Sequence, residues 1–358
     1  MRNLRDTDLN IAFIYGPKAY YLERGYSDTD CAELADKVTI NAVANALGKL
    51  GHRVSHVPGI KHLVGHLGAG EDKNWDLVFN FSEGVCGSAR ESQVPALLEA
   101  YGIVYTFSDA ATLSICLDKA KTKHYRVPTS PFVLVPVYGL KVDYACLAKE
   151  LSYPLFAKPV STSTSNGILP SNKISRPEDL EKTIENLRRQ LTAQEIIVEE
   201  FLDGREFTVA IIGTSSSARV LSALEMTWYN PEGHDNETSS LDFSTRFSKA
   251  GRGPGQDTGH IHADMADPLV TTVAEVALSA YQVLGCRDAA RVDIRLDSQK
   301  YGSVPNVIEV NPLFGLRDDY SLFTCIARNN GMDYNSIIAE VISSALQRRN
   351  KDDIRSIE

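Results

Sequence analysis

Charged residues at alternate positions in two neighbouring strand-like runs form the strongest chemical pattern in this sequence. The runs are 290–297 and 306–311, and in the first one apolar and charged residues alternate strictly from residue 291 onward. Side chains of a strand point alternately to its two faces, so the charged residues of one run share a face. The link 298–305 is short and contains Gly302. We therefore expect an antiparallel hairpin.

This hairpin would bring together Asp293, Glu309 and Asn311. Two carboxylates and an amide oxygen are hard oxygen ligands, which suit Mg²⁺ bound to nucleotide phosphates. Arg291 shares the face of Asp293, where it would complement negative charge that develops during a reaction. The alternative interpretation is a solvated sheet face with cross-strand salt bridges.

Lys158 lies near the end of a second strand-like run, 153–159, and is followed by the Ser/Thr-rich loop 161–167. Backbone N–H and hydroxyl groups of such a loop can cover phosphates while the lysine supplies a positive charge. The sequence contains no GxxxxGK[ST] motif, so this is not a Walker A loop. A plain surface loop is the alternative. Carboxylates at the corner near Glu199, Glu200 and Glu206 could hold ribose hydroxyls or face solvent.

The elements that position these residues fall into two groups. Strand and helix alternate over residues 1–117, which predicts an α/β unit with a mostly parallel sheet. Its expected strands are 10–16, 53–57, 76–81 and 103–106, and its expected helices are 31–50 and 94–101. The remainder is expected to hold strands at 131–135, 153–159, 196–202, 206–213, 290–297 and 306–311, and helices at 177–191, 264–284 and 335–349.

The stretch 229–260 is rich in Gly, Asn, Asp and Ser and is too long for an ordinary connection. We expect it to be a mobile lid.

Composition narrows the function classes. The net charge is −9 and there is no basic block, which argues against binding of nucleic acid. The sequence lacks the roughly 18-residue apolar run of a membrane span, and residues 1–6 lack a signal-peptide core. The six cysteines form no CxxC pair, which favours reduced thiols in a cytoplasmic protein.

Taken in order, these segments resemble the ATP-grasp fold, and specifically the D-alanine–D-alanine ligase family, from about residue 76 to about residue 345. The resemblance rests on 117–123 (LDKAKTK), 156–159 (FAKP), 198–202, 205–209, 291–293 and 308–312 (IEVNP). It implies an α/β protein with three parts, in which two α+β subdomains sandwich ATP. These parts are an N-terminal parallel-sheet domain (1–117), a central ATP-grasp subdomain (118–205) and a C-terminal ATP-grasp subdomain (206–358).

The resemblance also implies a nucleotide site. Lys119 and Lys158 would contact the phosphates, and Glu206 would hold the ribose. The loop that covers the phosphates would contain Thr164 and Ser165. The adenine edge would be read by the backbone of Glu199, Glu200, Phe201 and Leu202.

For the chemistry, the resemblance implies two Mg²⁺ ions, with Mn²⁺ as a substitute, on Asp293, Glu309 and Asn311. Arg291 would contact the transferring phosphate and the tetrahedral oxyanion. Arg246 lies where the family has a lysine in its loop, which supports the lid assignment.

The amino-acid half of the site departs from the family. Residues 15–21 offer no match for the glutamate that holds the first substrate, and Glu83 stands where the ligases have histidine. Arg90 stands about where they have an acidic residue, and Arg317 follows the metal ligands closely. We therefore expect a substrate with an additional polar or charged group, with Arg90 or Arg317 as the partner of a carboxylate. The alternative is that these charges pair with one another.

The sequence thus predicts an ATP-dependent ligase that joins two small amino-acid substrates through an acyl phosphate. The resemblance suggests a homodimer. Two alternatives stay open, a genuine D-alanine–D-alanine ligase and a non-catalytic nucleotide-binding protein on the same fold.

Overall fold

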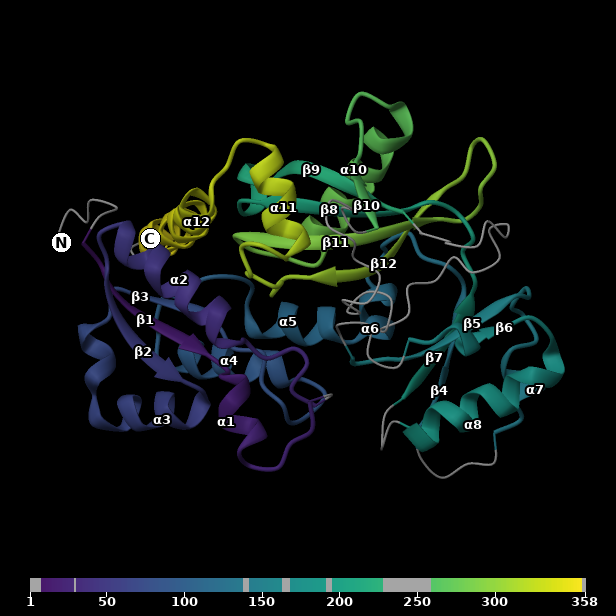
Figure 1. Ribbon diagram of the computed structural model, residues 1–358, viewed down its shortest axis with the longest axis horizontal. Helices are drawn as coiled ribbons and strands as arrows, with labels where there is room; N and C mark the ends of the chain where they lie inside the picture. Colours follow the sequence, from purple (N-terminus) through teal and green to yellow (C-terminus); the bar gives the residue numbers. More distant parts are fainter. Residues whose placement is uncertain are drawn as a thin grey trace.

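The computed structural model describes residues 8–28, 30–137, 142–162, 168–190, 195–227 and 259–355 (Figure 1). Thr164, Ser165 and Arg246 lie outside the described residues, as does all of the expected lid except its last two residues. Within the described ranges, no helix is long and apolar enough to cross a membrane.

The N-terminal part holds a three-stranded sheet in the order β2-β1-β3, and both strand pairs are parallel, as predicted. Its strands are β1 (Asn10–Tyr15), β2 (Arg53–Pro58) and β3 (Leu77–Phe81). Its helices are α1 (Lys18–Leu22), α2 (Lys37–Lys49), α3 (Ile60–Ala69), α4 (Gln93–Ala100) and α5 (Ala110–Leu117), and α6 (Lys119–His124) follows at once.

Two sequence predictions for this part are wrong in detail. The expected strand 103–106 is reduced to one bridge between Tyr105 and Val78, because Phe107 has a φ of 70° and turns the chain out of the extended conformation. The helix expected from residue 31 begins at Lys37. Asp36 sets this start, since its side chain accepts a hydrogen bond from the backbone N–H of Thr39 at 2.8 Å.

The central part is a four-stranded antiparallel sheet in the order β4-β7-β5-β6. Its hydrophobic core packs against one long helix, α8, through residues such as Ile184 and Leu187. The strands are β4 (Phe132–Val135), β5 (Leu155–Pro159), β6 (Lys173–Ile174) and β7 (Ile196–Glu200), and the helices are α7 (Tyr144–Leu147) and α8 (Leu180–Gln190).

The C-terminal part is a five-stranded antiparallel sheet in the order β10-β9-β8-β11-β12. The strands are β8 (Glu206–Ile212), β9 (Arg219–Met226), β10 (His260–His262), β11 (Ala289–Leu296) and β12 (Pro305–Asn311). The helices are α10 (Pro268–Val283), α11 (Leu322–Asn329) and α12 (Tyr334–Arg355). The sequence analysis missed β9 and α11, and His260, the last residue of the expected lid, begins β10 and pairs with Met226.

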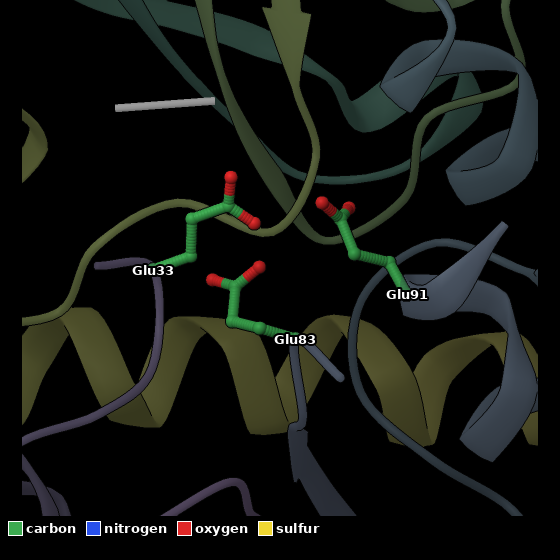
Figure 2. Close-up of side chains that lie close together, drawn as sticks. All are labelled: Glu33, Glu83 and Glu91. Carbon is green, nitrogen blue, oxygen red and sulfur yellow. The ribbon is translucent and has the colours of Figure 1, made fainter. Parts of the chain in front are cut away.

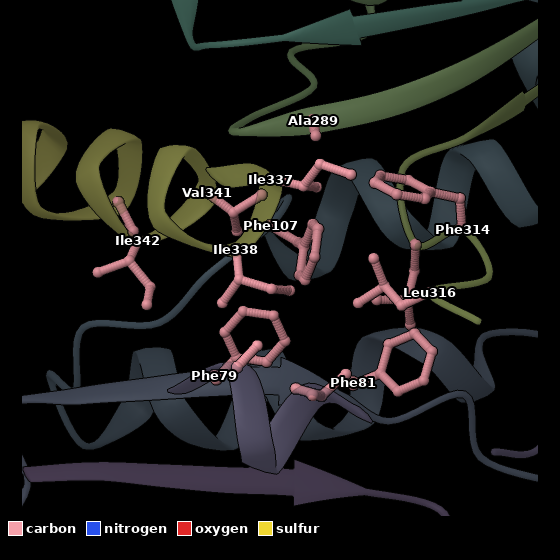
Figure 3. Close-up of a cluster of buried hydrophobic side chains, with 14 of the residues drawn as sticks. Phe79, Phe81, Phe107, Ala289, Phe314, Leu316, Ile337, Ile338, Val341 and Ile342 are labelled. Carbon is pink, nitrogen blue, oxygen red and sulfur yellow. The ribbon is translucent and has the colours of Figure 1, made fainter. Parts of the chain in front are cut away.

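Alternation along the strands divides this sheet between two cores. Val209 and Val292 pack with α10 on one face, whereas Ala210 and Ala289 pack with α11 and α12 on the other. The second core continues into the N-terminal sheet through residues such as Phe79, as Figure 3 shows. The first and last segments of the chain therefore share one hydrophobic core. The domain boundaries expected at residues 117 and 205 stay predictions.

We predict that Ile338→Ala lowers the free energy of unfolding by about 2–5 kcal/mol, because it opens a cavity in this shared core. Ile338 is 0% exposed. Val64→Ala is the control, since Val64 is 52% exposed, and it should change stability by less than about 0.5 kcal/mol. Urea unfolding followed by circular dichroism measures both. Equal midpoints for the two variants would contradict the shared core.

Candidate active site

The predicted hairpin is confirmed as β11 and β12. Arg291 pairs with Asn311 and Asp293 pairs with Glu309, and the register shifts after Asp293. Val292 and its alternate neighbours are buried against α10, so the charged residues face the opposite way. The hairpin therefore presents the four polar residues on one side.

The Asp293 carboxylate is held by three neighbouring side chains. Arg291 donates to it through Nε at 3.0 Å and Nη2 at 2.9 Å. Thr208 Oγ1 on β8 donates at 2.6 Å, and Asn311 Nδ2 donates at 3.3 Å. Burial works against the charge of Arg291, but Asp293 outweighs it and raises the pKa of the guanidinium. These hydrogen bonds fix the group of residues in position, and the Arg291 guanidinium stays charged.

Lys119, the first residue of α6, connects the hairpin to the central part. Its ammonium is 3.1 Å from Glu309 Oε1 and also donates to the backbone oxygen of Thr162. Thr162 follows β5, which carries Lys158. One buried ammonium therefore lies between a predicted metal ligand and the loop predicted to cover the phosphates.

Glu199 on β7 lies between two ammonium groups. Its carboxylate is 2.6 Å from Lys158 Nζ and 2.9 Å from Lys123 Nζ. Burial alone would raise the pKa of Glu199, but the two lysines outweigh it and hold the pKa at about 2. The sequence analysis considered the Glu199 carboxylate for ribose binding and its backbone for the adenine edge, but it did not predict these ion pairs and missed Lys123. Lys123 could have been found, because it lies one helical turn after Lys119.

A pocket lies among the central sheet, the C-terminal sheet and α6. It is lined by Lys119, Phe156, Lys158, Thr162, Ile168, Glu199, Glu200, Phe201, Leu202, Glu206, Asp293, Arg295, Ile308 and Glu309. Most of the residues predicted to bind nucleotide or metal are in this set. Arg291 and Asn311 are not, and they reach the pocket through their contacts with Asp293.

Arg295 is a pocket residue that the sequence analysis did not select. Its Nη1 is 3.4 Å from Glu206 Oε2, and its guanidinium lies over the ring of Phe201 at 5.2 Å. The same strand alternation that selected Arg291 and Asp293 also includes Arg295, so the signal was present.

The donor set of the hairpin fits Mg²⁺. The Asn311 amide lies 3.3 Å from the Asp293 carboxylate, and Glu309 is the cross-strand neighbour of Asp293. Each carboxylate is compensated by a cation of the chain, Asp293 by Arg291 and Glu309 by Lys119. Oxygen ligands of this kind are those that Mg²⁺ prefers.

The arginines expected to bind a substrate carboxylate have acidic partners within the chain. Arg90 donates to Glu33 Oε2 through Nε at 3.1 Å and through Nη2 at 2.5 Å. Arg317 is 2.9 Å from Asp319 and 3.1 Å from Asp36. The alternative stated above, in which these charges pair with one another, describes Arg317, which pairs with the nearby Asp319. Arg90 is also paired, but its partner Glu33 was not among the charges considered.

Glu83 and Glu91 lie near Arg90 in the sequence, and both of their carboxyl groups are buried. Burial raises the pKa of Glu83 well above its ordinary value, and the neighbouring Glu91 and Glu33 raise it further. Burial likewise raises the pKa of Glu91 to about 8, although Arg90 works against the shift. Glu91 was not selected from the sequence.

Comparisons with known proteins agree with this architecture. The protein family described as D-ala D-ala ligase C-terminus matches residues 123–343. A D-alanine–D-alanine ligase from Moorella thermoacetica is 30% identical over 86% of this chain and 93% of its own length. An uncharacterized protein, y4sG, from Sinorhizobium fredii is 29% identical over 76% of this chain and 75% of its own.

A solved structure shares the fold. The crystal structure of D-alanine–D-alanine ligase from Bacillus anthracis complexed with ATP superimposes with a TM-score of 0.69. The alignment covers 96% of this chain and 99% of that one at 21% identity.

We predict that Glu199→Gln lowers the free energy of unfolding by about 3–5 kcal/mol at pH 7, because it leaves two buried ammonium groups without a counter-charge. A carboxylate whose pKa is depressed stabilises the fold above its unfolded pKa, and this contribution is lost as pH falls through its folded pKa. The difference from wild type should therefore shrink as pH falls from 5 toward 2. Glu200→Gln is the matched control, since within the described residues the Glu200 carboxylate accepts one hydrogen bond, from the backbone N–H of Ser152. Urea titrations at several pH values measure the free energy of unfolding of the wild type and both variants. Equal losses of this free energy in Glu199→Gln and Glu200→Gln would contradict the pairing.

We predict that Glu91→Gln becomes more stable than wild type as pH rises. The folded protein holds a proton on Glu91 that the unfolded chain releases above its ordinary pKa of 4.5. The contribution of the neutral Glu91 to the free energy of unfolding of the wild type is therefore lost as pH rises from 4.5 to about 8. The glutamine of the variant stays neutral over this range and loses nothing. Melting temperatures at pH 6 and pH 9 test this, with exposed Glu181→Gln as control. A gap between Glu91→Gln and wild type that is the same at both pH values would refute the assignment.

Proposed function

This chain belongs to the D-ala D-ala ligase C-terminus family, and from that premise we propose that it is an ATP-dependent ligase that forms an amide bond between two amino acids. The family and its ligase relatives support the coarser statement, an ATP-dependent amide-bond ligase acting on small molecules. The amino-acid substrates and the acyl-phosphate route below are our proposal.

One observation carries the proposal. Oxygen ligands for a metal, Asp293 and Glu309, line the same pocket as two buried lysines, Lys119 and Lys158. A nucleotide triphosphate with Mg²⁺ needs both kinds of group, because the lysines would bind its phosphates and the carboxylates its metal. Phe201 and Leu202 line the same pocket and supply an apolar wall for a base.

The residues divide the work as follows. Asp293, Glu309 and Asn311 would hold the metal, which would offset negative charge on the transferring phosphate. Lys119 and Lys158 would position the phosphates, and Glu199 keeps Lys158 in place through the 2.6 Å ion pair. Glu206 would accept a hydrogen bond from the ribose while Arg295 fixes its side chain.

In the proposed reaction, a carboxylate oxygen of the first substrate attacks the γ-phosphorus, and ADP leaves. The amine of the second substrate then attacks the acyl carbon, inorganic phosphate leaves and the amine loses a proton. Arg291 would stabilise the oxyanion, because Asp293 fixes its guanidinium and keeps it charged. A homodimer, a cytoplasmic location and a second metal ion stay predictions.

Two other functions remain to be separated from this one. A genuine D-alanine–D-alanine ligase is supported by the names of the relatives. The buried Glu83 and Glu91 argue against it. Alanine has a single ammonium group and an apolar side chain, so it cannot compensate several buried carboxylates. A non-catalytic nucleotide-binding protein has no need of Asp293, Glu309 and Asn311 together. ADP release that depends on particular amino acids separates all three.

We predict that Glu309→Gln lowers ATP turnover by about 100-fold at saturating Mg²⁺, because a charge that stabilises the transition state is lost. Glu340→Gln on α12 is the control, since Glu340 is half exposed and its nearest ion-pair partner is 3.9 Å away. Substrate-dependent ADP release measures both variants, with circular dichroism to confirm folding. Turnover of Glu309→Gln within a few-fold of wild type would refute the metal assignment.

A further inference from the structure

Three carboxyl groups gather beside the pocket, from Glu33, Glu83 and Glu91. Each offers an oxygen, and these atoms all lie within 4.8 Å of one another. Glu33 precedes α2, Glu83 follows β3, and Glu91 lies in the short 3-10 turn Arg90–Ser92 before α4. Figure 2 shows the three carboxyl groups turned toward a common space from three separate segments.

Two of these carboxyl groups are buried, and no described residue forms a hydrogen bond or an ion pair with either of them. Glu83 is 7% exposed and Glu91 is 6% exposed. Both side chains point into the shared space (Figure 2). A buried carboxylate is unfavourable unless a cation or donors satisfy it, so this arrangement indicates a ligand with positive charge.

The cluster adjoins the proposed reaction centre. Arg90 pairs with Glu33 and also donates through Nη1 to the backbone oxygen of Ser161 at 2.9 Å. The next residue, Thr162, accepts from Lys119, which pairs with Glu309. A molecule held by the cluster would therefore lie next to the phosphate and metal groups.

Charge and geometry favour an ammonium ligand over a metal. Three carboxylates beside one guanidinium, Arg90, leave two negative charges when all are ionised. Oxygens spaced by up to 4.8 Å can each lie about 2.8 Å from a central atom, which is the length of an N–H···O bond. A bond from Mg²⁺ to oxygen is shorter, about 2.1 Å.

We propose that Glu33, Glu83 and Glu91 bind the positively charged amino groups of a diamino acid, and that this diamino acid is the substrate whose carboxylate is activated. The inference rests on the proposed function. One ammonium would balance one of the two negative charges, and the second amino group of the substrate would balance the other. When all three carboxyl groups are ionised, a monoamino acid such as alanine leaves one buried negative charge uncompensated.

The bound substrate acts as the carboxylate donor for a chemical reason. An ammonium held by carboxylates keeps its proton and has no lone pair with which to attack an acyl carbon. The amine that forms the new bond must then come from the second substrate. The position of the cluster beside Ser161 and Lys119 places the donor next to the phosphate groups.

The test compares binding and turnover in the full-length protein. Thermal shift without ATP would be measured with D- and L-forms of ornithine, lysine and 2,3-diaminopropionate. Norvaline, norleucine and alanine serve as counterparts with the same number of carbons and an uncharged side chain, and Mg²⁺, Ca²⁺ and Mn²⁺ are tested alone. The same amino acids are then tested in pairs for ADP release. The variants are Glu83→Gln and Glu91→Gln, which should fold because an amide carries no charge to bury, with Glu181→Gln as the exposed control.

We expect at least one diamino acid to stabilise the wild type and both Gln variants to bind it about tenfold more weakly, as loss of a charged hydrogen bond predicts. Norvaline or norleucine binding equally well would overturn the inference. A shift by a divalent cation that disappears in Glu83→Gln would overturn it in favour of a metal site. ADP release with D-alanine alone, unchanged in both Gln variants, would overturn this inference and leave the ligase function intact. Absence of ADP release with every pair would instead contradict the ligase function. The thermal-shift measurements would still show whether the three glutamates bind a diamino acid.

Discussion

Buried charges that must be compensated by one another are the constraint on which the active site depends. Glu199 holds Lys123 and Lys158, Glu309 holds Lys119, and Asp293 holds Arg291. Each of these pairs joins residues of different strands or helices, except Arg291 and Asp293, which share β11. An unpaired charge in such surroundings is strongly unfavourable, so the pairs fix how the elements around the pocket meet. The same charges are those that the proposed nucleotide and its metal would require.

The hydrophobic packing makes these pairs possible. Alternate residues of β11, such as Val292, are buried against α10, which leaves Arg291 and Asp293 on the opposite face. The other face of the sheet shares a core with the N-terminal sheet through α12. Because of this shared core, the segments that carry Glu33, Glu83 and Glu91 lie beside residues that are hundreds of positions later in the chain. Among the described residues, Glu83 and Glu91 have neither a hydrogen bond nor an ion pair, and burial of such groups lowers the stability of the fold.

Local patterns predicted what depends on local geometry. Strand alternation predicted the hairpin of Asp293 and Glu309. The position of Lys158 before a Ser/Thr-rich loop selected that lysine, and the family resemblance added Lys119; both lysines line the same pocket. Contacts between distant segments could not be predicted in this way. Glu33 and Glu83 are 50 positions apart, and no periodicity relates them. The ion pair of Arg90 with Glu33 could not be predicted, because Glu33 lies in an irregular segment that shows neither helical nor strand periodicity.

The most direct test of the account follows the oxygen atoms of the donor. The amino-acid pair that gives the fastest ADP release would be supplied with ¹⁸O in the carboxylate of the donor, and the released inorganic phosphate would be examined by mass spectrometry. If the carboxylate attacks the γ-phosphorus, the attacking oxygen leaves with the phosphate, so each phosphate from a fully labelled donor should carry one ¹⁸O atom. Phosphate without label, released together with an amide product, would contradict the acyl-phosphate route.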